Sequence, residues 1–205
     1  MSNWRKPGRR IILASNSPRR RTILRDMGFA FETMAPSVHN EERFLKSGAI
    51  GASLMELARA KARSVSVKHP DALVLGADTV VTLGDRILGK PKDKGEAAAM
   101  LRLLSNKKHV VYSAVALVCE ASRFVRTAVE KTVVAFREIG EKELSGYLRG
   151  RDFLDKAGAY AIQGKAMVFV KKIDGCYYTV VGLPVQKTID LFTAYLTRKE
   201  TDDVC

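Results

Sequence analysis

The sequence of 205 residues has no long uncharged apolar run, and it contains few cysteines and histidines. Without a run of about 18 apolar residues, no segment is expected to span a bilayer as a helix. The cysteines, Cys119, Cys176 and Cys205, are far apart and lack metal-ligand or redox spacing, which is typical of a reducing compartment. The three histidines show no paired spacing, which argues against a histidine-built zinc site. We therefore expect a soluble protein.

The charge of the sequence is strongly basic, with 35 lysines and arginines against 22 acidic residues. Such an excess of positive charge can favour binding to nucleic acid, to an anionic membrane or to a small anionic substrate. Beyond the basic segment 1–9 the positive charges are spread along the chain, and no zinc finger, basic zipper or aromatic–glycine RNA motif occurs. This distribution favours a polyanionic small ligand.

Hydrophobic residues make up 46% and charged residues 28% of the sequence, which is the balance of a folded globular protein. The length fits one domain or one two-lobed domain with a sizeable core. We interpret residues 1–9 as a basic tail, residues 10–198 as one two-lobed domain and residues 199–205 as a C-terminal tail.

Short β-branched runs alternate with helical patterns, which predicts an α/β fold. Strands are expected at 10–14, 72–77, 86–88, 110–118, 124–136, 166–173 and 177–181. Helices are expected at 18–27, 52–68, 94–104, 141–148 and 184–196. Gly84-Asp85 and Asp174-Gly175 each lie between apolar runs and indicate hairpin turns. Hairpins combined with crossover helices predict a mixed sheet.

A candidate phosphate site lies where the first expected strand passes into the first helix. Ser17-Pro18 predicts the start of that helix, and Arg19 to Arg21 follow in its first turn. Positive side chains are unfavourable there, but a bound anion would reverse the effect, because N–H groups, hydroxyls and guanidinium groups all donate to phosphate oxygens. The alternative is that the arginines point into water. Arg20, however, precedes Ile23 and Leu24 by three and four residues, so it begins the apolar stripe.

Two further charged residues interrupt apolar patterns. Lys61 falls on the apolar face of the helix expected at 52–68, where a lysine can either extend to water or reach a polar cleft. Asp78 follows the apolar run 73–77, and a carboxylate there is costly unless it is paired, metal-bound or open to a cleft. The hairpin that follows ends in Gly89-Lys90-Pro91 and can bring Lys90 beside Asp78 across its two strands. Both features favour a functional site.

The segment 155–164 reads Asp-Lys-Ala-Gly-Ala-Tyr-Ala-Ile-Gln-Gly, and its glycines permit close approach of the backbone. Gln163 offers a donor and an acceptor that suit the edge of a nucleotide base. A buried glutamine that serves loop carbonyls is the alternative interpretation.

These motifs, taken in order, resemble the Maf family, also called septum formation inhibitor proteins. The matching segments are Leu-Ala-Ser-Asn-Ser-Pro-Arg-Arg at 13–20, Gly-Ala-Asp-Thr-Val-Val at 76–81, Gly-Lys-Pro at 89–91, the segment 155–164, and Val-Gly-Leu-Pro at 181–184. The resemblance covers nearly the whole chain. It implies a mixed, elongated and twisted sheet flanked by helices, with two lobes and a central cleft, similar to inosine triphosphate pyrophosphatases. It also implies a cytoplasmic homodimer.

The resemblance further implies a hydrolase that cuts a nucleoside triphosphate to the monophosphate and pyrophosphate, assisted by Mg²⁺ or Mn²⁺. Asp78 would accept the proton of the attacking water, with Lys90 as its catalytic partner. Residues implied to bind phosphates are Ser15, Arg20, Lys61 and Lys90, and those implied to set substrate choice are Arg19, Thr79 and Gln163. The sequences of segments 159–164 and 177–184 resemble those of the family branch that acts on dTTP and UTP more than those of the branch that acts on 7-methyl-GTP.

One departure from the family pattern concerns the metal. Family members place acidic residues directly after the position that matches Val38, whereas this chain has His39-Asn40 there and reaches Glu41 and Glu42 only afterwards. Either glutamate, together with Asp78, can serve as a metal ligand. A second hypothesis is a binding protein whose basic surface holds nucleic acid or a division-machinery partner and whose nucleotide cleft is vestigial.

Overall fold

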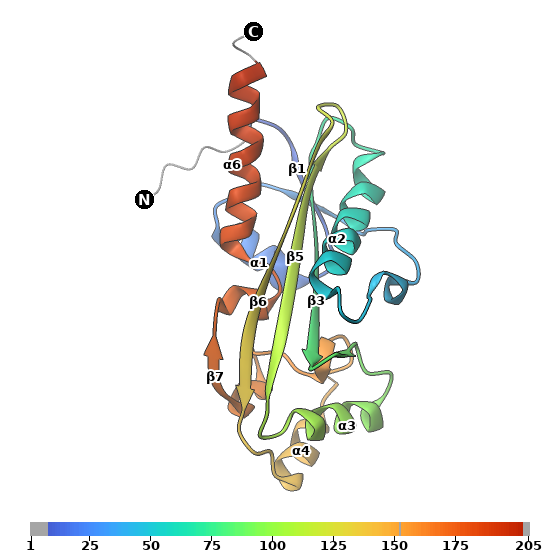
Figure 1. Cartoon of the computed structure of the whole chain (residues 1–205), viewed down its shortest axis with the longest axis vertical. Coiled ribbons are helices and arrows are strands. Elements are labelled where there is room, and N and C mark those ends of the chain that lie inside the picture. The colour runs from blue at the N-terminus through green and yellow to red at the C-terminus, as the bar shows by residue number, and fades with distance from the viewer. Residues whose placement is uncertain (1–7, 152, 203–205) are drawn as a thin grey trace. The chain divides into compact units, whose positions relative to one another are not determined.

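The computed structural model describes residues 8–151 and 153–202, and it contains one mixed sheet with helices around it (Figure 1). The strands are β1 Ile11–Ala14, β2 Glu32–Met34, β3 Leu73–Leu83, β4 Arg86–Leu88, β5 Lys108–Cys119, β6 Phe124–Phe136 and β7 Val170–Asp174. The α-helices are α1 Pro18–Asp26, α2 Ile50–Ser66, α3 Lys94–Leu104, α4 Glu141–Tyr147, α5 Tyr177–Val181 and α6 Val185–Asp202. Short 3-10 helices are η1 Glu41–Phe44, η2 Ala157–Ala159 and η3 Lys165–Phe169.

The seven strands have the order β2-β1-β3-β5-β6-β7, with β4 paired to β3. β1 is parallel to both β2 and β3, whereas β4 pairs antiparallel with β3 and β7 pairs antiparallel with β6. The expected mixed α/β fold is therefore confirmed.

The chain divides into two compact units, and the three long strands contribute residues to both. Unit 1 comprises the chain up to Asp78, residues 114–130 and the chain from Gly182 onward. Unit 2 comprises Thr79–Ser113 and Lys131–Val181.

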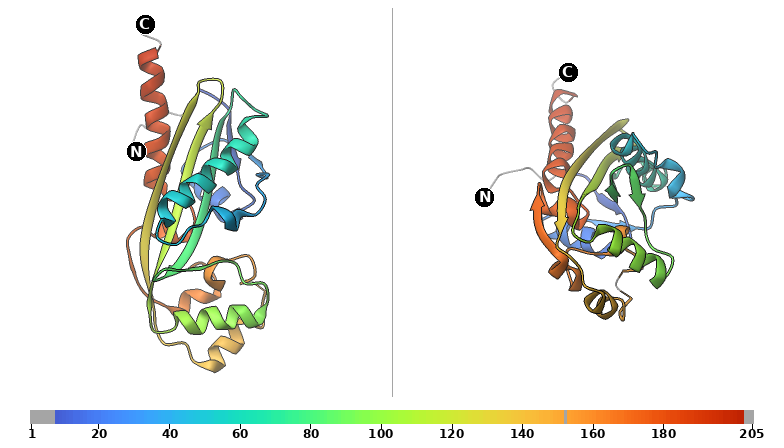
Figure 2. Two further views of the ribbon diagram at one scale, coloured as in Figure 1. Left: turned by 45° about the vertical axis from the view of Figure 1, so that its right-hand side comes forward. Right: turned by 60° about the horizontal axis from the view of Figure 1, so that its bottom comes forward.

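Unit 1 is built around strand residues that are buried on both faces. All four residues of β1 are buried, and β3 begins with a buried apolar run, which is typical of parallel strands covered by helices. The strands of this unit lie between α2 and α6 (Figures 1 and 2). Helix α6 makes two aromatic contacts within this unit: Phe192 packs on Phe29, and Tyr195 packs on Phe124 at the start of β6. Unit 1 is therefore a layered α/β core.

Unit 2 has its own core, to which the helices α3 and α4 contribute buried side chains. Aromatic rings dominate it, with Phe136 in edge contact with Tyr160, Phe169 and His109. Gly158 contributes a close approach, because it has a φ of +68° and a Cβ there would lie 3.1 Å from Val81. The segment around η2 is thereby held against the end of β3.

Several expected elements have the bounds that the sequence indicates. The helix at 94–104 and the strands at 86–88 and 124–136 are confirmed residue for residue. Gly84, with a φ of +57°, forms the turn between β3 and β4. The strand expected at 72–77 is longer, because it continues through Asp78 to Leu83.

Other predictions were wrong. Residues 177–181 form a short helix, α5, in place of the expected strand, because tertiary contacts override the β-propensity of their bulky side chains. Asp174-Gly175 consequently connects a strand to a helix and is not a hairpin turn. Within the expected strand at 166–173, the first part is the 3-10 helix η3. The short edge strand β2 was not predicted.

The expected tails are only partly within the described residues. Residues 1–7 of the basic tail and residues 203–205 lie outside them, and Arg9 donates from Nη1 to the carbonyl of Asp71 at 3.0 Å. Helix α6 continues to Asp202, so the described part of the expected C-terminal tail is helical. Among the helices of residues 8–151 and 153–202, none is long and apolar enough to cross a membrane.

Candidate active site

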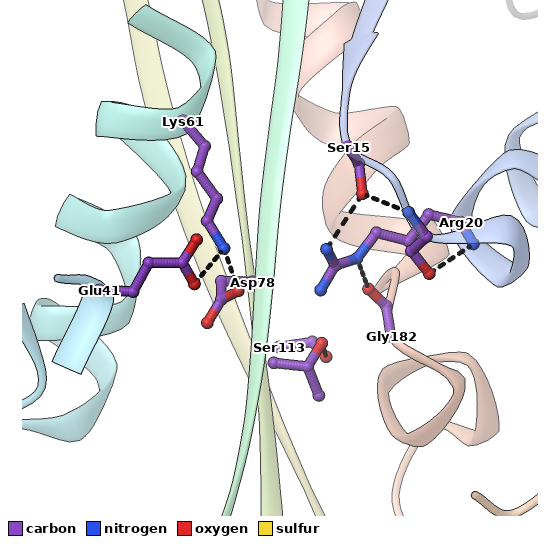
Figure 3. Close-up of polar contacts among 9 residues, drawn as sticks. Ser15, Arg20, Glu41, Lys61, Asp78, Ser113 and Gly182 are labelled. Atoms are coloured by element: carbon purple, nitrogen blue, oxygen red, sulfur yellow. Dashed lines mark hydrogen bonds and ion pairs between the residues drawn. The ribbon is translucent and has the colours of Figure 1, made fainter. Parts of the chain in front are cut away.

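The start of α1 brings together the serine and arginine side chains that the sequence predicts to bind phosphate. Ser17 caps the helix by accepting from the backbone N–H of Arg20, and Pro18 occupies the first turn. Ser15 is buried, and its Oγ accepts from the backbone N–H of Ser17 and from Nη1 of Arg20, both at 3.2 Å (Figure 3). With both lone pairs engaged, the Ser15 hydroxyl can act toward a ligand only as a donor. A phosphate oxygen is an acceptor and fits such a group.

Arg20 points inward, as its place on the apolar stripe predicts. Its Nε donates to the carbonyl of Gly182 at 2.8 Å, which holds the guanidinium toward the strands (Figure 3). Burial lowers the pKa of Arg20, and the nearby carboxylates of Asp78 and Glu41 act in the opposite direction. Because an arginine stays protonated in proteins, the half-buried group remains a cation within electrostatic reach of Asp78.

Lys61 is a buried lysine that bridges two carboxylates. Its Nζ lies 2.6 Å from Oδ1 of Asp78 and 2.8 Å from Oε2 of Glu41 (Figure 3). The side chain of Lys61 is only 8% exposed, that of Asp78 15% and that of Glu41 39%. The pairing explains how β3 accommodates an aspartate in its interior, since attraction to the Lys61 ammonium offsets part of the cost of desolvating the carboxylate.

The structure distinguishes between the two glutamates that the sequence left open. Asn40 adopts a left-handed conformation with a φ of 53°, which asparagine tolerates, and η1 begins directly after it. The turn directs Glu41 to Lys61, whereas Glu42 is exposed. Glu41 is therefore the glutamate that faces the Asp78 carboxylate across a shared cation.

Of the remaining predicted site residues, Arg19 lies half-buried in the first turn of α1 in unit 1, whereas Thr79, Lys90 and Gln163 belong to unit 2. Thr79 is half-buried, and its Oγ1 lies 2.7 Å from Oγ of Ser113, which in turn donates to the carbonyl of Thr179 at 2.7 Å. Since a hydroxyl has one proton, the hydrogen bond between Thr79 and Ser113 uses the proton of Thr79. Ser113 is a polar neighbour that sequence reasoning missed, and its signal is a lone buried serine inside the apolar run 110–118.

Lys90 and Gln163 are both exposed in unit 2. Lys90 lies two residues beyond the end of β4, whose register pairs Leu88 with Val81. The expected approach of Lys90 to Asp78 stays a prediction. Gln163 follows η2, and its exposure argues against the alternative of a buried glutamine that serves loop carbonyls.

The segment that carries Gln163 is fixed at its start by hydrogen bonds within unit 2. The backbone N–H of Gly158 donates to the carbonyl of Gly89 at 3.0 Å, next to Lys90. Tyr160 is buried, with its Oη 2.7 Å from Nε2 of His109. Burial lowers the pKa of His109 to about 4 and raises that of Tyr160, so both groups are neutral near pH 7.

The carboxylates of Glu41 and Asp78 have the donor chemistry for a divalent cation, and both already contact one cationic group, the Lys61 ammonium. Within the described residues no group of three or more His, Cys, Asp or Glu side chains could hold a metal ion. Mg²⁺ typically uses one or two protein carboxylates and completes its shell with phosphate oxygens and water. The pair therefore fits a cation that is bound together with a phosphate ligand.

Fold and site together define an α/β protein in which the Arg20 guanidinium, hydrogen-bonded to Ser15, and the Lys61 ammonium lie near the carboxylates of Glu41 and Asp78, an arrangement suited to phosphate chemistry. The model of the family described as "Maf-like protein" matches residues 10–195. The chain belongs to the Maf family. The matched range includes the serine–arginine motif at 13–20 and the motifs that contain Asp78, Thr79 and Lys90.

Two relatives illustrate the similarity. The "dTTP/UTP pyrophosphatase" of Pelotomaculum thermopropionicum is 44% identical over 186 residues, which cover 90% of this chain and 96% of that protein. A protein of the same name from Bacillus anthracis is 45% identical over 181 residues, covering 88% and 93% of the two chains. Among solved structures, the Ham1 protein of Staphylococcus aureus matches with a TM-score of 0.48 and 12% identity over 93% of this chain and 99% of its own.

Proposed function

We propose that the protein is a nucleoside triphosphate pyrophosphatase that hydrolyses dTTP and UTP to the monophosphate and pyrophosphate. The observation that carries the proposal is the buried contact between Lys61 and Asp78, within electrostatic reach of Arg20. Donors for a polyanion thus surround a carboxylate able to accept a proton. The names of the relatives at 44% and 45% identity support the same reaction and the same two substrates.

The chemical step requires one base and several donors. Asp78 accepts a proton from water, the water oxygen forms a bond to the α-phosphorus, and the bond from that phosphorus to the bridging oxygen breaks. Pyrophosphate leaves with the electron pair of the broken bond, and the nucleoside monophosphate keeps the oxygen of the water. Ser15, Arg20 and Lys61 hold phosphate oxygens through hydroxyl, guanidinium and ammonium donors.

Glu41 and Asp78 are the residues proposed to hold Mg²⁺ or Mn²⁺. When bound, a divalent cation neutralises charge on the phosphates and on the pyrophosphate leaving group. Lys90, from the hairpin after β3, is proposed as a further phosphate donor, and Arg19, Thr79 and Gln163 as the residues that select the base. We also propose that the enzyme acts in the cytoplasm as a homodimer, which light scattering on the purified protein would test.

Substrate profiling tests the proposed reaction. Purified protein would be incubated with UTP, dTTP, CTP, ATP and GTP in the presence of Mg²⁺ or Mn²⁺, and the products would be separated and quantified. The proposal expects pyrophosphate and monophosphate in equal amounts, fastest from UTP and dTTP. Orthophosphate as the first product would indicate cleavage at the terminal phosphate and overturn it.

The position of attack can be tested with ¹⁸O-labelled water. Attack at the α-phosphorus places the label in the monophosphate, whereas attack at the β-phosphorus places it in pyrophosphate. Mass spectrometry of the two products distinguishes these outcomes, and label in pyrophosphate would contradict the assigned role of Asp78.

Replacement of the proposed base separates an enzyme from a binding protein. Asp78→Asn is expected to abolish turnover while nucleotide binding is largely kept, and Asp71→Asn provides the control, because Asp71 is exposed and precedes the same strand. A protein that binds polynucleotides in a steeply salt-dependent manner and shows no turnover as wild type would support the binding-protein hypothesis instead.

A further inference from the structure

Lys61 occupies the place between two carboxylates that a cation would occupy. Its ammonium contacts Oδ1 of Asp78 and Oε2 of Glu41 at normal charge-assisted hydrogen-bond distances of 2.6 and 2.8 Å. Lys61 comes from α2, Glu41 from η1 and Asp78 from β3, so three separate elements converge on one positive centre (Figure 3). The chain thus supplies its own cation to the carboxylate pair.

A second cation at these carboxylates would compete with Lys61. The ammonium and a divalent ion repel each other at such short range, and both seek the same carboxylate oxygens. With the ammonium of Lys61 in place, the two carboxylates and the ammonium together carry only one net negative charge that could attract a metal. The nucleotide-free site is therefore expected to bind a divalent ion weakly.

A triphosphate changes this balance because it offers Lys61 another partner. Lysine has a flexible stem and a compact ammonium, so it can exchange a carboxylate oxygen for a phosphate oxygen by a change of rotamer. The phosphates also bring negative charge and the additional oxygen ligands that two carboxylates alone lack. Both effects favour the metal only once the nucleotide is present.

We propose that Lys61 holds the cation position between Glu41 and Asp78 in the nucleotide-free protein and is exchanged for the divalent ion when the triphosphate binds. Metal and nucleotide then enter the site interdependently, and Lys61 moves from the carboxylates to the phosphates. Lys61 thereby also keeps the carboxylate pair from collecting metal ions without substrate. This inference rests on the proposed function, in which Glu41 and Asp78 hold the metal.

Direct measurement of metal affinity tests the exchange without any use of activity. Mn²⁺ would be titrated into nucleotide-free protein, and free Mn²⁺ would be followed by electron paramagnetic resonance. Lys61→Met fills a similar volume without a charge, and it is expected to bind Mn²⁺ about tenfold more tightly than wild type, since a charge-assisted contact no longer has to be displaced. Arg59→Met is the matched control, because Arg59 is exposed on the same helix and its loss removes the same charge.

The position of the ion is tested by a double variant. Lys61→Met combined with Glu41→Gln is expected to lose the gain in Mn²⁺ affinity, because the ion depends on the carboxylate that Lys61 had covered. Persistence of the gain in the double variant would mean that the ion binds elsewhere and would overturn the proposal. Equal Mn²⁺ affinities of wild type, Lys61→Met and Arg59→Met would overturn it as well.

Coupling to the nucleotide gives a second measurement on the wild-type protein. A non-hydrolysable α,β-imido analogue of UTP is expected to raise the Mn²⁺ affinity of wild type about tenfold, after subtraction of the ion bound by the analogue alone. Lys61→Met should show a smaller increase, because only the charge and the oxygen ligands of the phosphates contribute in this variant. If circular dichroism showed that this variant does not fold, the wild-type measurement would decide, and the absence of any tightening would refute the exchange.

Failure of this proposal can be distinguished from failure of the proposed function. The wild-type protein could release pyrophosphate in a metal-dependent manner while Lys61→Met binds Mn²⁺ no more tightly than wild type. That result would support the proposed enzymatic function and would contradict the exchange of Lys61 for the metal. Absence of hydrolysis by the wild-type protein with either metal would instead remove the proposed function itself.

Discussion

Gly76 of β3 faces α2 so closely that a Cβ atom there would lie 2.3 Å from the carbonyl oxygen of Ala58 and 2.7 Å from the backbone nitrogen of Ala62. Asp78 follows two residues later, on the same face of the strand, and Lys61 lies between the two alanines on the helix. The absence of a side chain at Gly76 therefore sets the separation at which Lys61 and Asp78 meet.

Gly76→Ala is expected to destabilise the protein by about 2–3 kcal/mol, because the contacted atoms are backbone and can yield only by moving the helix. Urea denaturation followed by circular dichroism measures the change. Gly146→Ala is the control, since Gly146 lies in α4 and a Cβ atom there would have nothing within 4 Å, so alanine should leave stability equal or slightly higher. Equal unfolding midpoints for Gly76→Ala and wild type would show that α2 is not held this tightly.

Local signals explain which parts of the fold the sequence predicts well. Helix α3 has the expected bounds because Asp93 caps it by accepting from the N–H of Glu96 at 2.8 Å, and β4 follows a turn that requires glycine. The expected strand at 177–181 is a helix in the structure. The side chains of this segment favour strands, but the segment makes tertiary contacts in its helical form, such as the hydrogen bond from Ser113 to the carbonyl of Thr179. No local pattern encodes such a contact.

For the site, the informative signals were charged residues in apolar patterns. Arg20 begins the apolar stripe of its helix and Lys61 falls on the apolar face of another, and the structure places both inward. The choice between Glu41 and Glu42 could not be predicted, since it depends on the left-handed turn at Asn40. The carbonyl of Gly182 as a partner of Arg20 also lies beyond local prediction, because 162 positions separate the two residues.

Replacement of Arg20 tests the phosphate-binding role of α1. Arg20→Gln is expected to lower kcat/KM for UTP by roughly 100- to 1000-fold, as loss of one hydrogen-bond donor to the charge of a transition state typically does. Arg21→Gln is the matched control, because Arg21 is adjacent, equally charged and exposed, so its kcat/KM should stay close to that of wild type. Steady-state kinetics on both folded variants provides the comparison, and equal losses would indicate a general effect of positive charge instead of a specific contact.

The two glutamates allow a test of the proposed metal position. Glu41→Gln removes a carboxylate charge that faces Asp78 across Lys61, and it is expected to raise the Mg²⁺ concentration needed for half-maximal activity by about 10- to 100-fold. Glu42→Gln removes the same charge from an exposed side chain and should leave this concentration unchanged. Metal titrations of pyrophosphate release measure both, and a larger effect at Glu42 would reverse the assignment.

The stability of the protein is expected to fall as the pH decreases from about 6.5 to about 4, and His109 provides one cause. Burial lowers the pKa of His109 to about 4 in the folded protein, whereas the unfolded chain titrates near 6.5. Between these values the unfolded state binds the additional proton, so the free energy of unfolding falls with decreasing pH, by about 3 kcal/mol over the full window. Above pH 6.5 this contribution is fully present.

His109→Gln tests the contribution, because glutamine can still hydrogen-bond to Tyr160 but does not titrate. Its stability is expected to vary less between pH 6.5 and 4 than that of wild type, as measured by urea denaturation at several pH values. His39→Gln is the control, since His39 is exposed and its removal should leave the wild-type dependence in place. If His109→Gln retained the full wild-type slope, the buried imidazole would have to be protonated in the folded protein, and the assigned neutral pair with Tyr160 would be wrong.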